Sequence, residues 1–133
     1  MADQPQGLKK KILLADDAPD FVKVIKVRLE VSGYQVVTAS NGLEALERVE
    51  REKPDAVLLD ISMPGLEGLE VLRRIRRTHP ALPVFVVTGY TDDARLDTAI
   101  QLQASGFIVK TGDLKRAMAD IGNAIRLAEK YHQ

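Results

Sequence analysis

The chain of 133 residues contains no cysteine, so a disulfide scaffold and a thiolate zinc site are excluded. It also lacks an excess of charge, because 19 Lys and Arg residues balance 19 Asp and Glu residues. A dedicated nucleic-acid-binding protein is usually basic, so we expect no direct contact with nucleic acid. No apolar run is long enough to cross a membrane. Residues 12–15 are too short for the apolar part of a signal peptide, and two acids follow them. These absences favour a cytoplasmic protein with no membrane segment.

The chain contains enough apolar material for one ordinary domain. Hydrophobic residues make up 45% of it and charged residues 29%. A length of 133 residues is also common for a single domain. We interpret residues 1–9 as a flexible lead and residues 10–130 as the domain.

Short apolar runs alternate with segments of helical spacing. The runs are typical of strands covered on both faces. They lie at residues 12–15, 36–37, 56–59, 84–87 and 107–109. The segments between and after them predict amphipathic helices, with Leu43 and Ile100 expected to face inward. Pro19, Asn41 and Asp113 suit helix beginnings. This alternation predicts an α/β domain with a parallel sheet and helices on both faces.

Polar side chains stand where four of the expected strands end. Asp16 and Asp17 follow the first strand, and Asp60, Thr88 and Lys110 follow at the ends of the third, fourth and fifth. The crevice of such a sheet lies beyond these carboxyl ends. Clustered carboxylates repel one another unless a cation is present, and oxygen ligands in an open site suit Mg²⁺. A lysine and a hydroxyl beside them suit a phosphoryl group, and Asp60 in the middle is the natural nucleophile.

Taken one at a time, these residues have ordinary explanations. Asp17 ahead of Pro19 would be a turn former, and Lys110 would be a solvated lysine of a loop. Their order along the chain, each at the end of a strand, favours a functional site. We interpret the arginine-rich segment 73–77, by contrast, as a solvated helix face and not as a DNA site.

The segments ILLADDAP, DAVLLDISMPGLEGLEVLRRIR, VVTGY and GFIVK resemble the response-regulator receiver domain of two-component signal transduction. The resemblance covers residues 10 to about 128. It implies a flavodoxin-like fold, in which a five-stranded parallel sheet of order 2-1-3-4-5 is flanked by five helices. It also implies a phosphoacceptor signalling domain, not a turnover enzyme, that receives its phosphoryl group from a histidine kinase or a histidine phosphotransfer protein. No output domain is expected here, so a downstream protein or a linked output module would respond.

The resemblance implies a role for each polar residue of the crevice. Asp60 would accept the phosphoryl group. Thr88 and Lys110 would contact the phosphoryl oxygens. Mg²⁺ would be bound directly by Asp17, Asp60 and the backbone carbonyl of Ser62, and through water by Asp16.

The resemblance also implies which residues set the lifetime of the phosphoryl group and which transmit the phosphorylated state to the surface. Ser62 and Tyr90 would flank the path of the attacking water and tune hydrolysis. Thr88 would move toward the phosphoryl group, and Phe107 would turn into the vacated space as the switch. The surface of residues 92–103 and 107–128 would then dock a partner or form a homodimer.

Two positions depart from the family pattern. Thr111 follows Lys110 where the family usually has a proline joined by a cis peptide. A cis peptide before a non-proline residue costs about 3–4 kcal/mol. Phe107 lacks the hydroxyl of the commoner tyrosine, so the switch would act through packing alone.

Three other classes of protein share part of this pattern. A phosphatase of the haloacid dehalogenase type also uses an aspartate after an apolar strand, but its second aspartate is replaced by Ser62. A Rossmann enzyme needs a glycine-rich first turn, and the acids of ADDAPD would repel a pyrophosphate. A pseudo-receiver, which binds partners without phosphorylation, is the alternative, although the complete set of acids with Thr88 and Lys110 argues against it.

Overall fold

A computed structural model describes residues 10–63, 67–89, 93–110 and 113–131 of the chain. The strands form one parallel sheet of order β2-β1-β3-β4-β5. They are β1 Lys11–Ala15, β2 Gln35–Ala39, β3 Ala56–Asp60, β4 Val84–Thr88 and β5 Gly106–Val109. The helices are α1 Pro19–Val31, α2 Gly42–Glu52, α3 Gly68–Thr78, α4 Asp93–Gln101 and α5 Leu114–Tyr131. The predicted fold class and strand order are confirmed.

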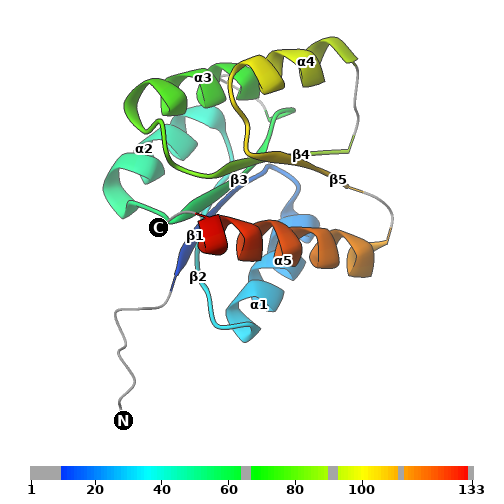
Figure 1. The fold of residues 1–133 in the computed structure, drawn as a ribbon. Coiled ribbons are helices and arrows are strands. Elements are labelled where there is room, and N and C mark those ends of the chain that lie inside the picture. The colour runs from blue at the N-terminus through cyan, green and yellow to red at the C-terminus, as the bar shows by residue number, and fades with distance from the viewer. Residues whose placement is uncertain (1–9, 64–66, 90–92, 111–112, 132–133) are drawn as a thin grey trace.

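The helices cover both faces of the sheet. Figure 1 shows α2, α3 and α4 on one face and α1 and α5 on the other. Alternate residues of each strand point to opposite faces, so Leu13 and Ala15 of β1 join the core under α2 to α4. Ile12 and Leu14 join the core under α1 and α5. This two-sided burial explains the continuous apolar runs of β1, β3 and β4.

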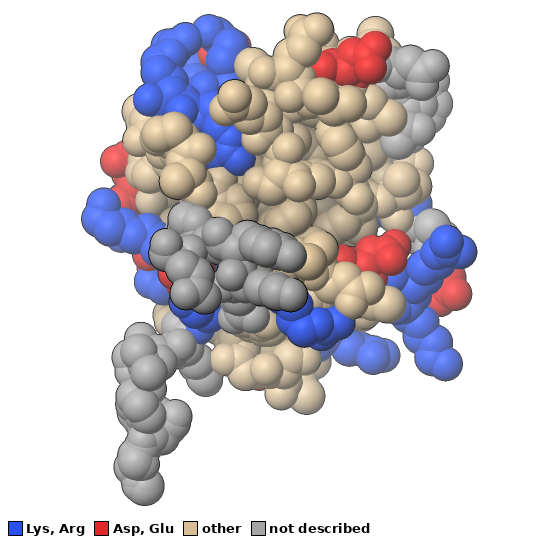
Figure 2. Space-filling model, viewed as in Figure 1, with Lys and Arg blue, Asp and Glu red and all other residues tan. Residues whose placement is uncertain are grey.

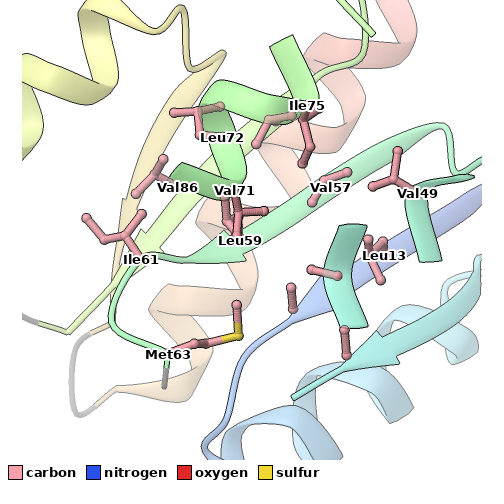
Figure 3. Packing of buried hydrophobic residues seen from close by; sticks show 14 of the residues in the cluster. Leu13, Val49, Val57, Leu59, Ile61, Met63, Val71, Leu72, Ile75 and Val86 are labelled. Carbon is pink, nitrogen blue, oxygen red and sulfur yellow. The ribbon is translucent and has the colours of Figure 1, made fainter. Parts of the chain in front are cut away.

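The core continues past the end of β3. Ile61 and Met63 are 2% and 5% exposed and belong to the same cluster as Leu59 and Leu72. Figure 3 shows both side chains among the residues of this cluster, just beyond the arrowhead of β3. The chain therefore leaves the strand without leaving the core, which keeps Asp60 between two buried neighbours.

Local signals for the helix beginnings behave as expected. Pro19 is the first residue of α1, where its missing N–H has no helical partner to lose. Asn41 Oδ1 accepts a hydrogen bond from the amide of Glu44 at 2.9 Å and caps α2. Asp113 Oδ1 accepts from the amide of Lys115 at 3.0 Å at the start of α5.

Two predictions about helix faces are wrong. Leu43 is 64% exposed and Ile100 is 58% exposed. The inward positions are taken by their smaller neighbours, Gly42 and Ala45 in α2 and Ala99 in α4. Small residues at these positions let the helix backbones lie close to the sheet.

The arginine-rich segment of α3 is only in part a solvated face. Lys and Arg side chains gather at the upper left of Figure 2, where Figure 1 places α3. Glu70 pairs with Arg73 and Arg74 at 2.6 and 2.8 Å, which partly neutralises the segment. Arg76 instead donates to the backbone carbonyls of Gln103 and Leu82 at 2.9 and 2.6 Å. Arg76 therefore connects α3 to the segments that precede β4 and β5.

Candidate functional site

The sheet topology brings the predicted polar residues to one edge. β3 lies between β1 and β4, and β4 lies between β3 and β5. Asp60 is the last residue of β3, Thr88 is the last of β4, and Lys110 follows β5. The amide of Lys110 donates to the carbonyl of Thr88 at 2.8 Å, so these two strand ends are directly joined.

Three carboxylates form the centre of the site. One oxygen of each of Asp16, Asp17 and Asp60 lies within 4.8 Å of the others. Asp16 and Asp60 are 2% and 3% exposed, whereas Asp17 is exposed. The amide of Ala18 donates to Asp16 Oδ1 at 2.9 Å. The amide of Ser62 donates to Asp60 Oδ1 at 2.8 Å. Backbone amides therefore orient both buried carboxylates.

Lys110 places its ammonium between the two buried acids. Its Nζ lies 2.7 Å from Asp16 Oδ2 and 3.3 Å from Asp60 Oδ2. The ring of Phe21, on the first turn of α1, lies beneath it with the centroid 4.5 Å from Nζ. The aromatic face attracts the cation without competing for a metal ion.

The charges of the site perturb its ionisation. Burial raises the pKa of Asp16, and the negative charge of Asp60 adds to this, against the opposing effect of Lys110 and of the Ala18 amide. Burial acts to lower the pKa of Lys110, but its hydrogen bond and attraction to Asp16 and the charge of Asp60 outweigh burial, so the pKa is raised. Lys110 is thus held as a cation among more carboxylates than it can neutralise.

The site fits a hard divalent cation. Asp16 Oδ2 is buried, and the group that faces it among the described residues is the Lys110 ammonium, 2.7 Å away. Three carboxylates facing one ammonium leave a negative excess. A solvent-open hollow of about 220 Å³, lined by Asp16, Asp17, Thr38 and Glu44 among others, adjoins the cluster. Oxygen ligands with room for water are what Mg²⁺ prefers.

The remaining predicted residues lie at or near this edge. Ser62 is exposed and directly follows Ile61 in the turn after β3. Phe107 lies on β5, opposite Val86, and is 39% exposed. Tyr90 and Thr111 lie outside the described residues, so the expectations for Tyr90 and for the Lys110–Thr111 peptide have no structural counterpart here.

Two contacts of the site were not predicted from the sequence. Phe21 is not among the residues that the sequence indicated for the site, yet its ring contacts Lys110. Arg95 of α4 donates to the carbonyl of Ile61 at 2.6 Å. The position of Phe21 in the first turn after the acid pair is a sequence signal that could have indicated the first contact. Nothing in the sequence around Arg95 indicates the second.

The fold and this site define a receiver domain. The family model of the response regulator receiver domain matches residues 12–122, and the chain belongs to this family. It is 34% identical over 122 residues to the alkaline phosphatase synthesis transcriptional regulatory protein PhoP of Bacillus subtilis, covering 92% of the chain and 51% of that protein. It is 38% identical over 122 residues to the probable transcriptional regulator ycf27 of Guillardia theta, covering 92% and 48%. The chain thus spans about half the length of these relatives.

Solved structures show the same architecture. A receiver domain protein from Methanospirillum hungatei is 29% identical with a TM-score of 0.82, and the match covers 92% of this chain and 98% of that one. The BeF₃-activated N-terminal receiver domain of Klebsiella pneumoniae RstA is 31% identical with a TM-score of 0.80, covering 90% and 97%. Receiver domains are signalling modules that pair with histidine kinases. Of the two relatives, the first is named a transcriptional regulatory protein and the second a probable transcriptional regulator. No helix in the described part of this chain is both long and apolar enough to cross a membrane.

Proposed function

We propose that the chain is a phosphoacceptor module in which Asp60 takes a phosphoryl group from a histidine kinase or a histidine phosphotransfer protein. The observation that carries this proposal is the position of Asp60. Its carboxylate is buried at a strand end, with Oδ1 bound by the Ser62 amide and Oδ2 facing Lys110. Burial in low dielectric and a fixed orientation favour nucleophilic attack over solvation of the carboxylate.

The residues around Asp60 would bind the metal ion and the phosphoryl oxygens. Asp17, Asp60 and the carbonyl of Ser62 would hold Mg²⁺, with Asp16 acting through water, and the metal would neutralise phosphoryl oxygens as charge develops. Lys110 would exchange its contact with Asp16 for a phosphoryl oxygen, because its Nζ already lies between both acids. The hydroxyl of Thr88, at the end of the neighbouring strand, would donate to another phosphoryl oxygen.

The phosphoryl transfer needs no further reactant. An oxygen of Asp60 attacks phosphorus, the bond from phosphorus to the imidazole nitrogen breaks, and its electron pair stays on that nitrogen. The product is an acyl phosphate on Asp60, which water later hydrolyses. The side chain of Ser62 has neither an amide nor a carboxylate group to position that water, and Tyr90 is large enough to shield the phosphoryl group. We therefore expect slow self-dephosphorylation.

The output would pass through the surface of α4, β5 and α5. Three large apolar side chains of α4 and β5 are exposed, Ile100, Phe107 and Val109. When Thr88 moves toward the phosphoryl group, Phe107 would turn inward and be buried. The changed surface would then bind a downstream protein, a linked output module or a second copy of the chain.

Phosphorylation with a small-molecule donor tests the proposal. With Mg²⁺ and phosphoramidate, the intact mass should rise by one phosphoryl group, and Asp60→Asn should prevent this. Asp97→Asn, at an exposed aspartate of α4, is the matched control and should be labelled like the wild type. Full labelling of Asp60→Asn, or no labelling of the wild type, would favour another acceptor or a pseudo-receiver.

A further inference from the structure

The Ile61–Ser62 peptide group, the second peptide after Asp60, is held between the side chains of Arg95 and Asp60. Arg95 of α4 donates from Nη2 to the carbonyl oxygen of Ile61 at 2.6 Å. The amide of Ser62 donates to Asp60 Oδ1 at 2.8 Å. The Ile61 carbonyl and the Ser62 amide belong to one planar trans peptide, so they point in opposite directions. A single peptide plane therefore connects the guanidinium of α4 to the carboxylate of Asp60.

Neighbouring groups keep this peptide plane in place. The side chain of Ile61 is 2% exposed and packs in the same core cluster as Ala99 of α4. Gly68, the first residue of α3, lies so close that a Cβ atom there would come within 2.3 Å of Ile61 Cα. The backbone of Ile61 thus has α3 tightly against it, and its carbonyl is held by α4.

The guanidinium of Arg95 is itself fixed at a second point. Arg95 also forms an ion pair with Glu67, the residue that precedes α3. The Glu67 side chain makes no capping hydrogen bond to α3, so its carboxylate is directed to Arg95 instead. One guanidinium makes both contacts, to the Glu67 carboxylate and to the Ile61 carbonyl. Less side-chain conformational entropy is therefore lost per contact than if two different side chains made them.

We propose that Arg95 is a positioning residue for Asp60 and acts through the Ile61–Ser62 peptide. A cationic donor on the carbonyl polarises the peptide and makes its N–H a stronger donor. The N–H then holds Asp60 Oδ1, which leaves Oδ2 directed at Lys110 Nζ, 3.3 Å away. The inference rests on the proposed role of Asp60 as phosphoacceptor. It connects α4 to the Asp60 carboxylate through a single peptide group.

The first measurement needs neither Mg²⁺ nor a phosphoryl donor. The Ser62 amide is followed by nuclear magnetic resonance in the wild type, Arg95→Gln and Arg95→Lys. Loss of the guanidinium should shift the Ser62 amide proton and speed its hydrogen exchange about tenfold, because the hydrogen bond from this amide to Asp60 Oδ1 is weakened and opens more often. Arg95→Lys keeps one cationic donor and should give an intermediate result. This variant also serves if Arg95→Gln does not fold.

The second measurement is the initial rate of phosphorylation by phosphoramidate at saturating Mg²⁺. Arg95→Gln should lower the rate about 3- to 10-fold. Arg73→Gln is the matched control, because Arg73 is an exposed arginine whose hydrogen bonds in the described residues go to Glu70. Glu67→Gln removes the ion pair and keeps the bond to Ile61, so its effect should be smaller than that of Arg95→Gln.

Three outcomes would overturn the positioning role. They are an unchanged Ser62 amide in Arg95→Gln, an equal loss of rate in Arg73→Gln, and an equal loss of rate in Glu67→Gln. Failure of the proposed function looks different, because the wild type itself would then take no phosphoryl group. The Ser62 amide would still show whether Arg95 orients the peptide.

Discussion

Gly68→Ala should destabilise the domain, because the new methyl group has no room. A Cβ at Gly68 would lie 2.3 Å from Ile61 Cα and 2.9 Å from its carbonyl carbon. Both are backbone atoms of a residue that is 2% exposed, so neither can move aside as the end of a flexible side chain would. Either α3 or the turn after Asp60 must shift.

The magnitude follows from two opposing effects. Overpacking of a buried site costs about 1–3 kcal/mol of unfolding free energy, and alanine in place of glycine gains up to about 1 kcal/mol in a helix. We expect a net loss of about 1–2 kcal/mol. With a urea dependence of about 1–3 kcal/mol per molar for a small domain, the unfolding midpoint should fall by roughly 1 M.

Gly122→Ala in α5 is the matched control. The nearest heavy atom to a Cβ there is Arg126 Nη1 at 3.5 Å, an ordinary contact, so only the helix gain of about 0.5–1 kcal/mol should be seen. Urea unfolding followed by far-ultraviolet circular dichroism measures both variants. A midpoint for Gly68→Ala at or above the wild-type value would refute the reasoning about Ile61, provided that Gly122→Ala raises the midpoint.

Three further predictions concern the acidic crevice. Burial raises the pKa of the Asp16 carboxyl in the folded state above 3.8, so the folded domain binds the carboxyl proton more tightly than the unfolded chain does. Ionised Asp16 therefore destabilises the folded state at high pH, and this cost disappears at low pH, where the carboxyl is protonated. Without Mg²⁺, Asp16→Asn should therefore raise Tm more at neutral pH than near pH 3.8; an equal gain at both would contradict this. Phe21→Leu removes an aromatic contact to Lys110 worth about 0.5–1 kcal/mol, so phosphoramidate labelling should slow about two- to fivefold, whereas Phe21→Tyr should retain the wild-type rate. Asp17→Asn should weaken Mg²⁺ binding in a calorimetric titration, because a direct ligand charge is lost, and unchanged affinity beside the exposed control Asp20→Asn would show that the metal lies elsewhere.

The fold could be predicted because its signals are local. The strands β1, β3 and β4 are buried by α1 and α5 on one face and by α2 to α4 on the other, so each contains a continuous apolar run that is easily recognised. The helix faces were harder to assign, since apolar character alone does not give the orientation of a helix about its axis. Leu43 and Ile100 are apolar, but each lies next to a smaller residue that occupies the inward position.

The reacting groups can be predicted from the sequence more easily than the groups that orient them. Asp60 and Lys110 are 50 residues apart in sequence, yet the parallel topology alone places both at one edge of the sheet, whatever the detailed packing. Arg95 and Ile61 are 34 residues apart, and their contact requires a particular orientation of α4 and an arginine side chain that reaches the Ile61 carbonyl. The strand order therefore predicts that Asp60 and Lys110 are close together, but it does not predict the contact between Arg95 and Ile61. Substitutions at Arg95 should therefore alter the rate of phosphorylation while they leave the strand order, and with it the set of reacting groups, intact.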